Sequence, residues 1–370
     1  MDNYEEIVKD REDGMSLRAI SRKHNISYST LYYRMKKAGL LNEKKDDNFI
    51  IKGESTLYDE EGNIKLKWVK TDKKKTDALD SFKEALDLLL LNEELTTKKN
   101  IRTPSDSDSD TLTVYTIGDA HIGMLAWDKE TGADHDLEIA EEDLLGAMDL
   151  LVEQSHRSAQ ALIVDVGDWF HADNNQNQTA KSGNALDVDG RYPRVLQIGL
   201  QLTIKLIDKA LAKHESVVWR SAVGNHNEHS AIMMGAFIQA WYRNEPRVQV
   251  ADTPNMFYYH IFGKNLIGIT HGHTAKAEKL GEIMSVDCET VWSDSKYRYW
   301  YTGHIHHQSV KEFPSCVVET FRTLAGKDAW HSSAGYRSGQ DMRAITLHKE
   351  YGEVSRNTVN IRMVRDRANE

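Results

Sequence analysis

The chain has 370 residues, of which 40% are hydrophobic and 28% charged, so it is long enough for one large domain and a smaller one. Its N-terminus, Met1 to Asp13, is charged, and its richest aliphatic run, Ala85 to Leu91, is too short to cross a bilayer, so no membrane protein is expected. Two cysteines, Cys288 and Cys316, cannot build a disulfide framework or a cysteine-rich zinc module. They favour a reducing compartment, the cytoplasm of a bacterium or of a phage-infected host.

Charge is unevenly distributed along the chain. The formal net charge is −10 at pH 7, which by itself argues against a nucleic-acid partner. Between Gly14 and Lys45, however, eight Lys and Arg residues accompany a single acid, Glu43. The N-terminal segment is therefore expected to have a function of its own.

Apolar residues at helical spacing predict three short helices between Asn3 and Leu40, with Ser16 and Ser27 at N-cap positions. The apolar set is Ile7, Leu17, Ile20, Leu31 and Met35. The segment from Ser16 to Gly39 resembles the helix-turn-helix units of resolvase-like and homeodomain-like proteins. This resemblance implies a small helical DNA-binding domain over residues 1–45, whose second helix enters the major groove.

The candidate DNA contacts combine positive charge for phosphates with hydroxyl and aromatic groups for base edges. They are Arg18, Arg22, Lys23, Tyr28, Ser29, Thr30, Tyr32, Tyr33, Arg34, Lys36 and Lys37. DNA is the partner expected for this segment. The alternative is a small helical module that docks to a protein and exposes a basic face.

Residues 46–110 are predicted to hold a hairpin, a helix and a polar linker. The hairpin joins Leu57-Tyr58 to the alternating run from Ile64 to Val69 through a turn at Glu61 to Asn63. The stretch from Asp77 to Leu95 has apolar residues on one helical face, so it is a connector or the contact surface of a homo-oligomer. The residues that need to be covered are Leu86, Leu89 and Leu90. The run from Lys98 to Asp110 is too polar to pack and is expected to be a linker.

From Leu112 onward, five β-rich runs each end in residues that commonly bind metals. The runs and their endings are Leu112 to Ile117 with Gly118-Asp119-Ala120-His121, Ala161 to Val166 with Gly167-Asp168-Trp169-Phe170-His171, Val217 to Val223 with Gly224-Asn225-His226-Asn227-Glu228, Leu266 to Thr270 with His271-Gly272-His273, and Arg298 to Thr302 with Gly303-His304-Ile305-His306. Helical stretches lie between them, as in an α/β sandwich that presents its site at the strand ends. We expect the five endings to converge on one site.

The order of these motifs, DxH, GD, GNH, a strand-ending His and GHxH, resembles the calcineurin-like metallophosphoesterase superfamily over roughly Thr111 to Val364. The resemblance implies a four-layer α/β/β/α sandwich over residues 111–366 and two divalent cations bridged by Asp168. It assigns Asp119, His121 and His306 to the first cation, and Asn225, His271 and His304 to the second. Two such cations hold a phosphate, lower the pKa of a bridging water and stabilise the leaving oxygen. A mixed set of His, Asp and Asn favours manganese, with iron or zinc as alternatives and magnesium less suited.

The resemblance also assigns catalysis to His226, which would protonate the leaving alkoxide or stabilise charge in the transition state. The family usually has Asp directly after this histidine. Here Asn227 stands in that place and Glu228 follows, so the group that orients His226 is left open. Of the two histidines in His-Gly-His, the strand-end position favours His271 as the ligand and leaves His273 as a neighbouring or substrate contact. Glycines at Gly118, Gly167, Gly224 and Gly303 are expected where the backbone turns sharply and approaches the ions.

Local detail around Asp168 favours DNA as the substrate. The segment from Gly167 to His171 resembles the GD-x-F-H segment of the double-strand-break repair nuclease branch, in which the histidine reaches the substrate phosphate. His171 is the candidate for that role, and a surface histidine without a role is the alternative. The polar loop from Ala172 to Arg191 is expected to line a strand-binding groove or to be a solvated loop. Its candidate side chains are Asn174, Asn175, Asn177, Lys181, Arg191 and nearby Arg194.

The segment after His306 is expected to form strands that close the second sheet, at Val317 to Phe321, Ala344 to His348 and Thr358 to Met363. Repair nucleases of that branch carry a capping domain and an ATPase partner; here DNA recognition is expected to fall to the N-terminal unit, and an ATPase partner is left open. The chain is therefore interpreted as a metal-dependent phosphodiesterase, specifically a DNA nuclease that uses a metal-activated water. The alternatives are a phosphatase or nucleotide phosphodiesterase that its helix-turn-helix localises, and a binding scaffold with a vestigial site. The complete ligand set argues against the scaffold.

Overall fold

The computed structural model describes residues 4–12, 49–58, 64–73, 78–90, 101–179, 183–251, 253–333, 335 and 337–368, with single positions between 15 and 35. The chain divides into two compact units, Met1–Lys75 and Thr76–Glu370. Among the described residues, no helix is both long enough and apolar enough to cross a bilayer.

In the smaller unit, α1 (Tyr4–Glu12) contributes to a cluster of buried apolar side chains. The cluster consists of Ile7, Ile20, Leu31 and Met35, four of the five residues predicted to form the helical core. Asp10 of α1 accepts hydrogen bonds from Lys23 Nζ at 2.8 Å and His24 Nε2 at 2.6 Å. Most positions of the second and third predicted helices lie outside the described residues, so the helix-turn-helix stays a prediction.

The predicted hairpin is confirmed. Strands β1 (Phe49–Tyr58) and β2 (Ile64–Lys73) pair antiparallel, with Tyr58 opposite Ile64 and Phe49 opposite Lys73. Both strands are longer than expected, because the β-favouring residues Phe49, Ile50 and Ile51 extend the pairing beyond Leu57-Tyr58.

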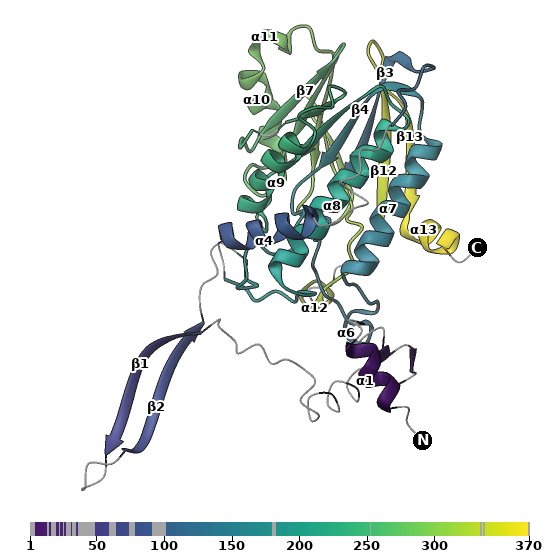
Figure 1. Ribbon diagram of the computed structural model, residues 1–370. Helices are drawn as coiled ribbons and strands as arrows, with labels where there is room; N and C mark the ends of the chain where they lie inside the picture. Colours follow the sequence, from purple (N-terminus) through teal and green to yellow (C-terminus); the bar gives the residue numbers. More distant parts are fainter. Residues whose placement is uncertain are drawn as a thin grey trace. The chain divides into compact units, whose positions relative to one another are not determined.

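The larger unit is built on two mixed sheets (Figure 1). The six-stranded sheet has the order β13-β12-β3-β4-β5-β6, and the five-stranded sheet the order β10-β11-β9-β8-β7. The strands of the first are β3 (Asp108–Ile117), β4 (Ser158–Asp165), β5 (Ser216–Ser221), β6 (Val248–Val250), β12 (Asp341–His348) and β13 (Gly352–Asn360). Those of the second are β7 (Tyr258–Phe262), β8 (Asn265–Ile269), β9 (Tyr297–Thr302), β10 (Ser309–Glu312) and β11 (Val317–Thr320). Strands β3 to β6 run parallel, as do β8, β9 and β11.

Helices cover both outer faces of this pair of sheets, which gives the expected order α/β/β/α. The six-stranded sheet packs against α7 (Leu137–Gln154), α8 (Tyr192–Leu211), α9 (Glu228–Trp241) and α13 (Ile361–Ala368), and the five-stranded sheet against α10 (Ala277–Asp287) and α11 (Glu289–Trp292). Alternation along β3 shows how one strand serves two cores: Leu112 and Val114 face the other sheet, whereas Tyr115 and Ile117 face the helices. Both cysteines are buried, in the core under α10.

Helix α4 (Ala78–Leu90) belongs to the larger unit and packs on α8. Ala85 and Leu89 are fully buried there, with Leu86 partly buried beside them. Arg191 forms an ion pair with Glu84 of α4 at 3.5 Å. The sequence predicted that this apolar face belongs to a connector or to a homo-oligomer contact. In the structure, helix α8 of the same chain covers it at Leu86 and Leu89.

The C-terminal segment differs from the prediction in two respects. Strands β12 and β13 join the six-stranded sheet, because β12 pairs antiparallel with β3, and only β10 and β11 extend the second sheet. The run from Thr358 to Met363 is not one strand, since β13 ends at Asn360 and α13 begins at Ile361. Ile361 and Val364, three residues apart, bury one helical face, and Val364 lies so close to α7 that a Cβ on Gly146 would meet it at 2.3 Å.

We expect Leu89→Ala to lower the free energy of unfolding by about 2–5 kcal/mol, because it leaves a cavity between α4 and α8. Leu88→Ala is the matched control, since Leu88 is 38% exposed and should change stability by less than about 0.5 kcal/mol. Urea unfolding of the full chain measures both. Equal losses for the two variants would show that α4 is not packed as described.

Candidate metal centre

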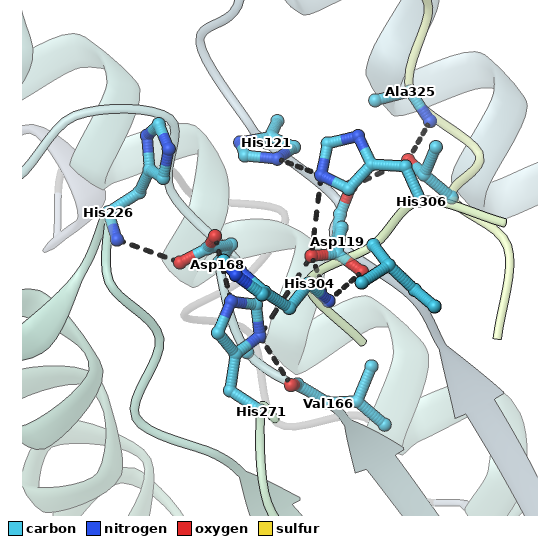
Figure 2. A network of polar contacts seen from close by, with 12 residues as sticks. Asp119, His121, Val166, Asp168, His226, His271, His304, His306 and Ala325 are labelled. Carbon is cyan, nitrogen blue, oxygen red and sulfur yellow. Dashed lines mark hydrogen bonds and ion pairs between the residues drawn. The ribbon is translucent and has the colours of Figure 1, made fainter. Parts of the chain in front are cut away.

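All five sequence motifs meet at one end of the two sheets. The loops after β3, β4 and β5 come from the six-stranded sheet, and the loops after β8 and β9 come from the other. Within each sheet these strands are parallel, so their carboxyl ends lie at the same edge. Figure 2 shows the resulting network of carboxylates and imidazoles.

One donor group consists of Asp119, His121 and His306, whose ligand atoms all lie within 4.8 Å of one another. His121 Nε2 is 3.1 Å from His306 Nε2, and His306 Nε2 is 3.5 Å from Asp119 Oδ1. Two imidazole nitrogens and a carboxylate oxygen therefore face one point. We call this set the first donor group.

The second donor group is Asp168, His271 and His304, whose ligand atoms again lie within 4.8 Å. His271 Nδ1 donates to the Val166 carbonyl at 2.9 Å, which directs Nε2 to Asp168 Oδ2 and Asn225 Oδ1, each 3.0 Å away. His271 Nδ1 is also 3.9 Å from Asp119 Oδ1, so the two donor groups adjoin.

The buried carboxylates of the two donor groups favour positive charge nearby, as the pKa of His271 shows. Burial by itself would lower the pKa of His271, but the Asp168 and Asp119 carboxylates outweigh burial and raise it to about 9. Burial lowers the pKa of His121, assisted by the surrounding histidines, so its ring is neutral and its lone pair is available for a metal.

Hydrogen bonds and backbone geometry fix both carboxylates. Asp119 accepts the backbone N–H of His304 with both oxygens, at 2.9 and 3.1 Å, and Asp168 Oδ1 accepts the backbone N–H of His226 at 2.8 Å. Five of the donor residues have left-handed backbone conformations, which are strained for residues other than glycine. Their φ values are 35° for Asp119, 44° for His121, 54° for Asp168, 73° for His304 and 53° for His306. Such concentrated strain is typical of a functional site.

Two glycines are required by the carboxylates themselves. A Cβ on Gly224 would lie 2.1 Å from Asp168 Oδ1, and a Cβ on Gly303 would lie 2.6 Å from Asp119 Oδ2. Both contacts are far inside van der Waals distance. The glycines expected near the ions thus let the backbone approach the carboxylates.

This donor set fits divalent cations. Its ligand atoms converge at two adjoining points, and they combine imidazole nitrogens with carboxylate and amide oxygens. The residues that would hold the cations are Asp119, His121, Asp168, Asn225, His271, His304 and His306.

His226 is oriented by a backbone carbonyl. Its Nδ1 donates to the His171 carbonyl at 2.9 Å, because a carbonyl can only accept, and its ring stacks on His171 with centroids 5.6 Å apart. Neither residue after His226 takes this role: Asn227 accepts the Gly224 N–H at 3.1 Å, and Glu228 is exposed at the start of α9. The orienting bond of His226 uses Nδ1, so Nε2 is the ring nitrogen that can face a substrate.

His171 is buried instead of lying on the surface. Its Nδ1 is 3.2 Å from His121 Nδ1, and among the described residues its Nε2 has no hydrogen-bond partner. Together with His121 and His226 it forms a third group of candidate ligand atoms. His273 lies outside these groups, with its ring 5.2 Å from that of His271 and 6.1 Å from that of His304.

No protein-family model and no curated protein matches the chain. Among solved structures, an archaeal phosphodiesterase aligns over 67% of this chain and 99% of its own length, with 10% identity and a TM-score of 0.33. Vacuolar protein sorting 29 from Cryptosporidium parvum aligns over 67% and 96%, with 13% identity and a TM-score of 0.32. A phosphoesterase-like protein from Streptococcus pneumoniae aligns over 68% and 98%, with 9% identity and a TM-score of 0.28. Similarity at this level says nothing of reaction or substrate, which are therefore inferred from side chains.

Most of the proposed DNA contacts cannot be compared with the structure. Of the eleven, only Lys23 is described, and it forms an ion pair with Asp10 at 2.8 Å. The others, Arg18, Arg22, Tyr28, Ser29, Thr30, Tyr32, Tyr33, Arg34, Lys36 and Lys37, lie outside the described residues, as does Lys181 in the polar loop. Arg191 of that loop is directed to Glu84 of α4.

The sequence reasoning missed three residues near the centre: Asp165, Asp328 and His331. Asp165 is fully buried and accepts the Gly167 N–H at 3.0 Å and the Ser221 hydroxyl at 2.5 Å, while burial raises its pKa to about 7. The sequence feature that could have identified Asp165 is its position as a carboxylate within an otherwise apolar β-rich run. His331 stacks on His306, and the Asp-x-x-His spacing from Asp328 was its only signal.

We expect Asp168→Asn to lose at least one bound Mn²⁺, because the amide removes a negative charge from the second donor group. Elemental analysis after dialysis against Mn²⁺ measures the ions retained per chain. Asp294→Asn is the control, since Asp294 is an exposed aspartate that precedes the amino end of β9, whereas the donor groups lie at its carboxyl end. Unchanged metal content in Asp168→Asn would contradict the assignment of Asp168 as a ligand.

Proposed function

We propose that the chain is a dinuclear metal-dependent phosphoesterase that hydrolyses phosphodiester bonds, with DNA as its substrate. The observation that carries the proposal is the pair of adjoining donor groups, linked by the 3.9 Å approach of His271 Nδ1 to Asp119 Oδ1. Divalent cations bound there would neutralise phosphate charge and supply a water of lowered pKa as the nucleophile.

The chain's own contribution to the reaction centres on His226. Its ring lies beside the donor groups, 5.0 Å from the ring of His121, and its Nδ1 is held by the His171 carbonyl. A ring fixed at Nδ1 can present Nε2 to the oxygen that leaves phosphorus and can hand it a proton. His171 assists by orienting His226 through its carbonyl while its own ring contacts the rings of both His121 and His226.

DNA as substrate is supported by two features of the sequence. Gly167 to His171 is similar to the segment found in repair nucleases, and the basic segment between Gly14 and Lys45 carries charge suited to phosphates. Manganese is the cation we favour for the mixed donor set. A phosphatase or nucleotide phosphodiesterase, and a binding scaffold, are the alternatives that the following measurements separate.

We expect His226→Ala to keep its metal content while turnover of DNA falls on the order of a hundredfold, the contribution of one positioned acid. A nitrophenyl phosphodiester should lose less, because nitrophenolate leaves without a proton. Steady-state rates on both substrates in saturating Mn²⁺ provide the comparison.

His229→Ala is the control for this variant, since His229 lies on the same segment with an exposed side chain and should leave both rates near those of the parent protein. Equal losses on the two substrates would point to charge stabilisation by His226 instead of proton donation. Loss of a bound metal would make His226 a ligand.

We expect deletion of residues 1–75 to weaken binding to duplex DNA and to flatten its salt dependence, because the deletion removes the basic segment. It ends before α4, whose packing on α8 belongs to the larger unit. Hydrolysis of a small phosphodiester should survive. Unchanged affinity for duplex DNA at several salt concentrations would favour the protein-docking alternative for this segment.

A further inference from the structure

A segment that the metal motifs do not include runs past the first donor group. After β11 the chain forms an isolated bridge between Gly118 and Thr323, and the Thr323 hydroxyl donates to the Asp119 carbonyl at 2.7 Å. The segment then enters α12 (Ala329–Ser333), which contacts α6 (Asp128–Thr131). The first donor group and α12 are therefore joined by a short stretch of chain, in which the Ala325 N–H donates to the Thr323 hydroxyl at 2.8 Å (Figure 2).

Within this segment, Asp328 fixes the ring of His331. Asp328 Oδ1 accepts the backbone N–H of His331 at 2.8 Å and its ring Nδ1–H at 2.7 Å. Burial would raise the pKa of Asp328, but the hydrogen bonds from His331 outweigh burial and hold it at about 2, so the carboxylate is ionised and accepts. Both side chains are nearly buried, with 9% and 12% exposure.

The fixed ring lies flat on a proposed metal ligand. His331 and His306 stack with centroids 4.5 Å apart and planes inclined by 19°, closer than the 5.6 Å stack of His226 on His171. His306 has a strained backbone, with φ at 53°, so its side-chain direction is not secured by regular secondary structure. A flat neighbour that is itself pinned restricts the rotation of the His306 ring.

We propose that His331 is a positioning residue of the first donor group: pinned by Asp328, it holds the His306 ring so that Nε2 points at Asp119 and His121. This inference rests on the proposed dinuclear centre. On this proposal, His331 raises the affinity of the first donor group for its cation and does not contact the substrate. Partners that orient metal ligands typically affect affinity by about 10- to 100-fold.

The test uses the full chain after EDTA treatment, titrated with MnCl₂ by calorimetry. His331→Ala removes the ring, and His331→Phe keeps a flat ring but loses the bond to Asp328. His156→Ala is the matched control, because His156 is also bonded to an aspartate, Asp108, at 3.1 Å, but lies at the opposite end of β3 from the centre. Thermal unfolding of the metal-free variants confirms that each is folded.

We expect His331→Ala to weaken one of two Mn²⁺ binding events by about 10- to 100-fold and to leave the other unchanged. His331→Phe should recover only part of the loss, because it keeps the stacked ring but not the bond that pins it to Asp328. Turnover of a nitrophenyl phosphodiester by His331→Ala should fall at limiting Mn²⁺ and return at saturating Mn²⁺, with KM unchanged. His156→Ala should match the parent protein in both measurements.

Three results would overturn the proposal or its basis. Parental Mn²⁺ affinity in His331→Ala, with a turnover loss that saturating Mn²⁺ does not repair, would make His331 a substrate contact. An equally weak site in His331→Phe would show that stacking does not hold His306. Absence of Mn²⁺ binding in the parent protein would refute the proposed dinuclear centre itself, and that outcome is distinct from the other two.

Discussion

The structure of the centre depends on two carboxylates that are fully buried where the two sheets meet. Asp119 and Asp168 come from the ends of adjacent parallel strands and have 0% and 1% of their surface exposed. A buried carboxylate is tolerated only when hydrogen bonds and positive charge compensate for the lost hydration. Backbone N–H groups of His304 and His226 supply the hydrogen bonds, and the imidazoles and the cations they would bind supply the charge.

The same requirement explains the surrounding irregular backbone. Bringing N–H groups to both carboxylates needs sharp turns at the strand ends, and these put His304 and His306 in left-handed conformations and leave no room for a side chain at Gly224 or Gly303. Such turns cost free energy locally. This cost is offset by burial of apolar side chains in three cores, one between the sheets and one on the outer face of each sheet. These cores contain none of the metal-ligand candidates, but they fix the strands whose ends carry those residues.

The sequence predicted the parts of the centre that follow from strand ends. Residues such as Asp119, His271 and His306 directly follow β-rich runs, and parallel strands bring their ends together without further information. His331 could not be found in this way, because its relation to His306 is a contact between a loop and a short helix. The strand misassigned at Thr358 to Met363 has a related cause: Ile361 and Val364 suit a helix face as well as a buried strand until the position of α7 is known.

Because ligands for the centre come from both sheets, its cations would bridge the two halves of the sandwich. Asp119, His121 and Asp168 follow strands of one sheet, whereas His271, His304 and His306 follow strands of the other. An ion bound across this seam resists sliding or separation of the sheets in the way a cross-link does. By mass action, free metal at about 100 times its dissociation constant would stabilise the native state by about 2.7 kcal/mol. Metal supply would then govern how long this fold survives heat or proteolysis, apart from any role in hydrolysis.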